Sequence, residues 1–320
     1  MTTDVFAGQR VYVTGKFPGL QKDEVYAYLL GHGADGTTSK SRAQAFLCPD
    51  PTDAKLVATG KPCYTLDALG APLEGYLQRL KAGVQHRRED LKRNKQFVCH
   101  LAHGKPASAA LVAKVAAAIG FPVPPDLRAL MGQFNGLSAA VAVLKRGASV
   151  ELADDKPLPY AALADLKHPL WQGKIEWLIG VIGIPSWEDI FLRPQKDRLC
   201  NLDGYTAASE ALKIGALKLK PAALFPRLFA FDLFHHYAGT ALYADPKDET
   251  MKAIYAFDYW ADLTSAHPVS LRAYMESLAA GIWGRGVHAG QRIIKPVSKT
   301  AWPTYIRNIH GAPYVFIELK

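Results

Sequence analysis

Residues 10–15 read RVYVTG, and this stretch decides how the first part of the chain folds. It is short, apolar and β-branched, and it ends at a glycine, which is typical of a buried β-strand. Further short apolar strands are expected at residues 45–48 and 63–64, and helices at 22–30 and 53–59. Because strands and helices alternate, the sequence predicts a small parallel sheet covered by helices, an α/β arrangement.

A different pattern begins after the helix that is expected over residues 73–93, because a new strand-like run starts at Phe97. Downstream, helices are expected at residues 107–119, 125–134 and 269–282, and strands at 177–184, 228–231, 240–244 and 253–257. We therefore predict a first domain over residues 1–92, a linker over 93–106, and a second domain of strands and helices over 107–320.

The composition is that of a folded protein with a mild basic bias. The chain has 320 residues, of which 49% are hydrophobic and 21% charged, enough for two domains. Its net charge of +9 favours an anionic partner without choosing between nucleic acid, an anionic surface and an acidic protein. The N-terminus lacks a leader pattern, and the longest apolar stretch, residues 177–185, is shorter than the ~20 residues that cross a bilayer. We expect a cytoplasmic protein without a membrane partner.

The four cysteines are expected to be structural. No two of Cys48, Cys63, Cys99 and Cys200 form a CxxC pair, and Cys48 and Cys99 follow apolar residues. Clustered ligands for zinc are missing from the sequence. The pattern favours small buried side chains in a reducing compartment.

No catalytic motif is complete in the sequence, since GxSxG, HExxH and the P-loop are missing. Residues 31–36 spell GxGxxG, but they follow an expected helix, which Gly31 is expected to end, and precede a strand. A dinucleotide site needs the reverse order. The adjacent histidines at 235–236 would point to opposite faces of a strand and would rarely bind one metal together. We therefore expect a protein that is not an enzyme, with no cofactor, metal or small-molecule substrate.

The first domain carries a family resemblance. Residues 8–17 read GQRVYVTGKF, and the order continues with GHGA at 31–34 and GKPCY at 60–64. Over residues 6–90 the sequence resembles BRCT domains, and most closely the single BRCT domain of bacterial NAD-dependent DNA ligases. A tryptophan that many BRCT domains carry in the last helix is absent here. The resemblance implies a binding module built on a small four-stranded parallel sheet with flanking helices.

In phosphopeptide-binding BRCT domains, a Ser/Thr-Gly pair that ends the first strand and a lysine that starts a later helix hold a phosphate. Thr14 and Gly15 match the pair, and Lys55 is the candidate lysine. A hydroxyl, a backbone N–H and an ammonium at a helix start all suit a dianion. The alternative is that Thr14 satisfies backbone groups at a turn and that Lys55 is an ordinary surface lysine.

Basic residues offer a second candidate surface. Arg10, Lys16 and Lys40 could contact a DNA backbone through charge alone, in a salt-sensitive way. The end of the helix expected over residues 73–93 adds further candidates, which are Arg87, Arg88, Lys92 and Arg93. A basic run at this place also suits the negative end of the helix dipole on a solvated helix, so both interpretations stay open.

The second domain carries a resemblance of its own. Residues 120–128 read GFPVPPDLR, an NG pair follows at 135–136, and residues 184–191 read IPSWEDIF. These segments resemble the SUKH family, also called Smi/Knr-like. Later runs at 229–232 and 270–278 fit a strand of that family and its closing helix.

The SUKH resemblance spans residues 105–285, with an insertion-like stretch around 193–225. It implies an antiparallel sheet with helices, and a polar turn followed by a short strand after the Ile-Pro pair. SUKH members are mostly protein-binding, and many bacterial ones are immunity proteins that bind and block a toxin. No catalytic residues follow from the resemblance.

Two functions remain open at this point. The favoured one is a non-enzymatic adaptor, in which the SUKH-like domain binds a partner protein such as a toxin and the BRCT-like domain serves as a tether. The alternative is a protein associated with DNA or DNA repair, whose BRCT-like domain binds DNA or a phosphorylated repair or replication protein.

Overall fold

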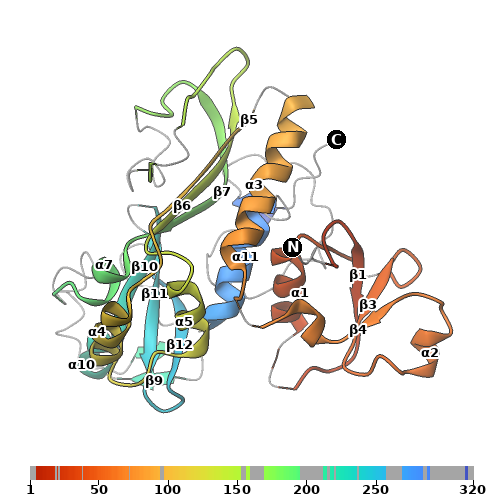
Figure 1. Cartoon of the computed structure of the whole chain (residues 1–320), viewed down its shortest axis with the longest axis horizontal. Coiled ribbons are helices and arrows are strands. Elements are labelled where there is room, and N and C mark those ends of the chain that lie inside the picture. The colour runs from red at the N-terminus through yellow and green to blue at the C-terminus, as the bar shows by residue number, and fades with distance from the viewer. Residues whose placement is uncertain are drawn as a thin grey trace.

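The computed structural model shows a mixed α/β chain with one parallel sheet and several antiparallel sheets (Figure 1). It describes residues 5–18, 20, 22–37, 39–71, 73–93, 97–152, 156–158, 169–194, 212–214, 217–219, 221–235, 238–256, 269–283, 287–288 and 314–315. Cys200, His236 and most of the insertion-like stretch lie outside these residues, as do the side chains of His235, Arg87, Lys92 and Arg93.

The N-terminal unit is built on a four-stranded parallel sheet in the order β2-β1-β3-β4. Its strands are β1 (Arg10–Val13), β2 (Asp35–Gly36), β3 (Ala45–Leu47) and β4 (Cys63–Tyr64). Val11 and Val13 in the central strand are fully buried. The small parallel sheet predicted from the sequence is therefore confirmed.

Helices connect these strands and cover the sheet. They are α1 (Lys22–Gly31), α2 (Ala54–Val57), a 3₁₀ helix (Leu66–Leu69) and α3 (Tyr76–Arg93). The prediction that Gly31 ends α1 is wrong, because the helix includes Gly31 and it is Gly33 that has the left-handed φ of 76°. Gly31 is needed for space, since a Cβ there would lie 2.8 Å from the carbonyl oxygen of Glu276.

The two faces of the parallel sheet pack against different partners. Val11 and Val13 belong to the large core that also includes α1. Tyr12 lies on the opposite face, because side chains alternate along a strand. On that face a small cluster forms, which we call the α2-side cluster. It consists of Ala43, Phe46, Cys48 and Leu56, with Tyr12 and Cys63 packed against it.

The second unit begins with an antiparallel sheet of β5 (Phe97–His103), β6 (Leu137–Leu144) and β7 (Ile175–Ile184). Phe97–His103 lies within residues 93–106, which we expected to be a linker. Instead this segment pairs along its whole length with β6. Pairing with β6 gives the backbone N–H and C=O groups of this segment hydrogen-bond partners, which buried backbone groups need.

A second antiparallel sheet has the order β10-β11-β12-β13. Its strands are β10 (Leu228–His235), β11 (Ala238–Asp245), β12 (Thr250–Ala256) and β13 (Val269–Ser270). Two further two-stranded antiparallel sheets pair β8 (Leu212–Ile214) with β9 (Leu217–Leu219), and β14 (Val287–His288) with β15 (Tyr314–Val315). β10 also contacts β7, which brings the two larger sheets together.

The helices of the second unit are α4 (Ala109–Ile119), α5 (Pro125–Met131), α7 (Trp187–Phe191), α10 (Pro221–Leu224) with a 3₁₀ turn (Phe225–Arg227), and α11 (Leu271–Trp283). The short strand expected after the Ile-Pro pair is wrong, since α7 occupies that place. Ser186 caps α7 by accepting a hydrogen bond from the Asp189 N–H at 3.1 Å. Trp187, Ile190 and Phe191 are then buried at helical spacing.

Helix α11 joins the two units. It lies beside α3 in Figure 1 and contacts both α1 and α3. The Tyr76 hydroxyl of α3 donates a hydrogen bond of 2.9 Å to the Met275 carbonyl of α11. As a result, the buried side chains of the parallel sheet and those around α11 form one continuous core. Among the described helices, none is long and apolar enough to cross a membrane.

Candidate functional site

The end of β1 lies beside the loop that follows β3. The Thr14 N–H donates a hydrogen bond of 3.0 Å to the Leu47 carbonyl. Gly15 has a φ of 86°, and a Cβ at this position would lie 2.6 Å from Cδ of Pro49. A glycine is therefore required here for two reasons, its backbone conformation and the close approach of Pro49.

Lys55 lies on α2, a helix of a single turn in which the N–H groups of Leu56 and Val57 donate to the Asp53 carbonyl. The Asp53 carboxylate accepts a hydrogen bond of 2.8 Å from the Lys55 N–H. In the same loop, hydrogen bonds from the Thr52 hydroxyl and N–H lower the pKa of Asp50. A phosphate at this helix start would have to compete with two carboxylates. The structure thus brings Thr14 and Gly15 next to the loop leading to Lys55, and phosphate binding by the three residues stays a prediction.

The structure describes the side chains of four residues that we predicted to contact DNA. Arg10 begins β1 and is exposed at the amino end of the parallel sheet, whereas Lys16 follows the carboxyl end of the same strand. Lys40 is exposed in the loop before β3. Arg88 lies on α3 and is half-buried. Of these four described residues, Arg10 and Lys40 share an edge of the sheet, and DNA binding by the predicted set stays a prediction.

Two further cations lie at that edge, Arg42 and Lys61, and we call Arg10, Lys40, Arg42 and Lys61 the basic edge. The Lys61 ammonium donates hydrogen bonds of 2.9 and 3.0 Å to the carbonyls of Lys40 and Ser41. The Arg10 N–H donates a bond of 2.8 Å to Oε1 of Gln44. These bonds hold three chain segments together at one end of the sheet.

The charges of the basic edge are accessible. Arg10, Lys40 and Arg42 are exposed, and none of them forms an ion pair with a described carboxylate. The Lys40 ammonium lies 5.8 Å from the centre of the Tyr12 ring. Arg42 and Lys61 were not among the predicted residues, although both stand just before a strand. In a parallel sheet such positions meet at the same edge, so this signal could have found them.

In the second unit, a polar junction connects the turn after α5 with the start of α7. Oδ1 of Asn135 accepts a hydrogen bond of 2.7 Å from the Trp187 N–H, and Nδ2 donates one of 2.8 Å to Glu188. The indole N–H of Trp187 donates to the Phe134 carbonyl at 2.6 Å. Asn135 satisfies two partners at once, because its amide carries an acceptor oxygen and a donor nitrogen on separate atoms.

Aromatic rings extend this junction into the core. Trp187 stacks against Phe134 at 5.5 Å and against Phe231 of β10 at 6.1 Å between ring centres. Phe231 in turn meets Tyr274 of α11 edge-on at 6.2 Å. The segments around residues 135, 187, 231 and 274, which are far apart in the sequence, therefore form one aromatic cluster.

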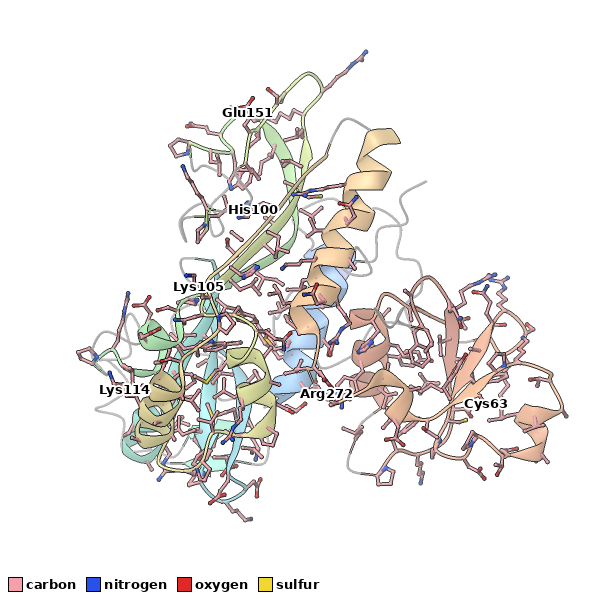
Figure 2. The ribbon with its side chains drawn as sticks, viewed as in Figure 1. Cys63, His100, Lys105, Lys114, Glu151 and Arg272 are labelled. Carbon is pink, nitrogen blue, oxygen red and sulfur yellow. The ribbon has the colours of Figure 1, made fainter. Side chains whose placement is uncertain are left out.

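An open apolar groove runs along α4. It has a volume of about 640 Å³. Its lining residues are Ala109, Val112, Ala113, Ala116, Ala117, Gly120, Phe121, Pro122, Val123 and Arg128. Ala113 and Ala117 are exposed in this groove, and Lys114 lies on the outer side of α4 (Figure 2). Small side chains along a helix let the backbone of another segment approach closely.

One buried pair resembles part of a catalytic arrangement, but its position argues for a structural role. Nε2 of His100 on β5 lies 3.1 Å from Oγ of Ser138 on β6. The same Oγ accepts a hydrogen bond of 3.1 Å from the Leu158 N–H. His100 and Ser138 are both buried, so a substrate could not reach them. The pair connects two strands with the segment around residue 158.

Comparisons with known proteins bring no assignment, since no family model and no curated protein matches the chain. Within the described ranges, no group of three or more His, Cys, Asp or Glu side chains could hold a metal ion. The inference of function therefore has to start from the surfaces described above.

Proposed function

We propose that the chain is a non-enzymatic adaptor, with a BRCT-like N-terminal unit and a SUKH-like second unit that binds a partner protein. The observation that carries the proposal is the apolar groove on α4, which is open to solvent and lined by small side chains. Exposed apolar surfaces of this kind commonly mark sites of protein interaction. The partner is a toxin, in an immunity-type role, or a protein of DNA repair or replication.

The strand order supports the BRCT-like part of the proposal. All four strands are parallel, and β1 lies in the interior of the order β2-β1-β3-β4. The helix α1 packs on one side of the sheet and α2 on the other. Fold alone does not define what such a module binds.

The aromatic cluster supports the SUKH-like part. The sequence segments that suggested this family are the NG pair, the IPSWEDIF run, the strand at 229–232 and the closing helix. Asn135, Trp187, Phe231 and Tyr274 represent these four segments, and they meet in one cluster. Motifs that meet in space are a stronger argument for a shared fold than motifs that only follow one another in sequence.

Site-specific photocrosslinking tests the proposal in the protein's own cells. A benzophenone amino acid replaces Ala113 in the groove or, as a control, the exposed Ala58 at the end of α2. A discrete crosslinked partner is expected at position 113 alone. An excess of chain without the benzophenone amino acid should compete for this partner and reduce the crosslink, whereas an excess of the Ala113→Glu variant should not. Mass spectrometry then identifies the partner as a toxin or as a repair protein. Equal background at positions 113 and 58 would overturn the proposal.

The basic edge favours a second candidate function, binding to the phosphate backbone of DNA. Three of its four cations are exposed and form no ion pair with a described carboxylate. They come from the start of β1 and from the loop before β3, which hydrogen bonds hold together with Lys61. Because the segments that carry these cations are already held together, phosphate binding does not require the backbone to rearrange first. Such binding is independent of base sequence and weakens steeply with salt.

A salt titration with a short DNA duplex tests this second function. Each phosphate contact contributes about −0.9 to the slope of log K against log salt. The double variant Lys40→Gln/Arg42→Gln should therefore make the slope shallower by nearly two. The matched control is Lys105→Gln/Lys114→Gln, which removes the same charge from the exposed surface near α4 (Figure 2). Equal losses in both variants, or no binding at low salt, would exclude the basic edge.

A further inference from the structure

Cys48, directly after β3, and Cys63 of the neighbouring strand β4 lie on the same face of the parallel sheet. Phe46 of β3 is in register with Cys63 of β4, so these two side chains point the same way. Cys48 is two residues after Phe46 and shares its face. The Cys48 N–H also donates a hydrogen bond of 2.9 Å to the Tyr64 carbonyl, which ties its backbone to β4.

Both cysteines belong to the α2-side cluster, Cys48 as a buried member and Cys63 packed against it. Burial raises the pKa of Cys48 to about 11, and the neighbouring Cys63 thiol adds to the effect. Each thiol also has a backbone acceptor, the Tyr64 carbonyl at 3.7 Å for Cys48 and the Lys61 carbonyl at 3.6 Å for Cys63. Cys48 is 2% exposed, whereas Cys63 is half-buried and reaches the surface. One thiol is thus accessible, and the second lies behind it.

We propose that Cys48 and Cys63 are a modification site, at which a hydroperoxide converts the two thiols to a reversible disulfide. In the first step the Cys63 thiolate attacks a peroxide oxygen and the O–O bond breaks. With hydrogen peroxide this gives a sulfenic acid on Cys63 and one water. In the second step the Cys48 thiolate attacks the sulfenic sulfur, the S–S bond forms and the S–O bond breaks. The leaving hydroxide takes up the proton that Cys48 lost, so the two thiols lose two electrons and the peroxide becomes two waters.

The position of the pair in the sheet allows the bond to close. Cysteines that are diagonal neighbours on adjacent strands need a backbone shift before their sulfurs can bond. β4 is the edge strand of the sheet, contains two residues and pairs with β3 alone among the described strands. An edge strand of this length can move toward its neighbour without breaking a second ladder.

The disulfide would close a ring over residues 48–63, which contains α2 with Lys55 and also Lys61 of the basic edge. Oxidation would therefore restrict the loop between β3 and β4. Anion binding at the predicted phosphate site and at the basic edge would then depend on whether the disulfide has formed. This last consequence rests on the proposed DNA-binding function, whereas formation of the disulfide does not.

The rate should depend on pH through Cys48. Burial raises the pKa of the Cys48 thiol, and the negative charges of Asp50 and Asp53 add to the effect. Lys61 contacts Cys63 through its carbonyl, while its ammonium donates to the carbonyls of Lys40 and Ser41. If attack by Cys48 limits the reaction, the rate should rise about tenfold per pH unit between pH 7 and 9, in proportion to the thiolate.

The experiment treats the full chain with hydrogen peroxide, stops the reaction in acid, and labels free thiols with a maleimide after denaturation. We expect two fewer labelled thiols, a peptide link between Cys48 and Cys63, and recovery of both thiols with dithiothreitol. Cys63→Ser should abolish the link, while Cys99→Ser, at another buried cysteine, should leave it intact. Sulfinic acid on Cys63 with a free Cys48, or a link that forms only in urea, would overturn the proposal.

Discussion

Glu276 of α11 accepts a hydrogen bond of 2.5 Å from the guanidinium of Arg79 on α3, across 197 residues of sequence. Glu276 is fully buried, and His32 at the end of α1 lies 3.9 Å from the same carboxylate oxygen. Arg272, one turn earlier on α11, lies 4.2 Å from the ring of Tyr28 on α1 (Figure 2). The contact between the two units is therefore ionic and aromatic as well as apolar.

The ion pair between Arg79 and Glu276 predicts a large effect of single substitutions. Glu276→Ala leaves the Arg79 charge buried without its partner, which should lower the free energy of unfolding by about 3 kcal/mol. Arg79→Ala should cost a similar amount, and the double variant should cost clearly less than the sum. Urea unfolding measures all three, with exposed Lys81→Ala as the control. Additive losses would show that the two side chains do not depend on each other.

Gly31 should not tolerate a methyl group. A Cβ at this position would collide with the Glu276 carboxylate and lie 2.8 Å from its carbonyl oxygen, so α1 and α11 would have to move apart. Gly31→Ala should lower stability by about 2 kcal/mol, as overpacked contacts do. Gly132→Ala is the matched control, since a Cβ there would meet its nearest atom at 3.4 Å. Thermal unfolding compares the two variants, and an equal melting temperature would contradict the close packing.

The amide of Asn135 should be required by the polar junction. Asn135→Ala leaves the Trp187 N–H without its acceptor in a partly buried place, at a cost of about 1–3 kcal/mol. Asn135→Asp keeps that acceptor but places a second negative charge beside Glu188. Because protonation removes this repulsion, the stability of Asn135→Asp should recover as pH falls. Denaturation at pH 7 and pH 4 measures both effects. A variant at exposed Ser149 serves as the control, and identical stability of all three proteins would show that the junction contributes nothing.

Acid should weaken the turn between β11 and β12. Burial alone would raise the pKa of Asp245, but hydrogen bonds from the Lys252 ammonium and the Lys247 N–H outweigh it and lower the pKa on balance. The pKa in the folded state is thus below that of the unfolded chain. The stabilisation is present above the ordinary pKa of 3.8 and is lost as pH falls below it. Stability measured from pH 5 to 2 should fall less steeply in Lys252→Met, and parallel curves would contradict the prediction.

The sequence was most informative where a residue's role depends on its near neighbours. The run at residues 10–15 contains β1, and the helix expected over residues 107–119 is found as α4. The strand expected after Pro185 failed, because Ser186 followed by acidic residues in the first turn favours a helix start, a signal that the family resemblance overrode.

The candidate surfaces were harder to predict, because they depend on contacts between distant segments. The charges of Arg10 and Lys16 are six positions apart, yet they lie at opposite ends of one strand. No sequence motif links Arg79 to Glu276, because they are 197 positions apart and meet only through the packing of α11 on α3. The same holds for Cys48 and Cys63, whose shared place in the α2-side cluster depends on the register between β3 and β4.

The position of α11 has a consequence for synthesis on the ribosome. Tyr28 and Gly31 of α1 reach their packing partners only after about 240 further residues have been made, which at roughly 5–20 residues per second takes tens of seconds. Throughout that interval the nascent N-terminal unit presents the α1 surface without its cover. The interface between α1 and α11 therefore forms only after most of the chain has been made.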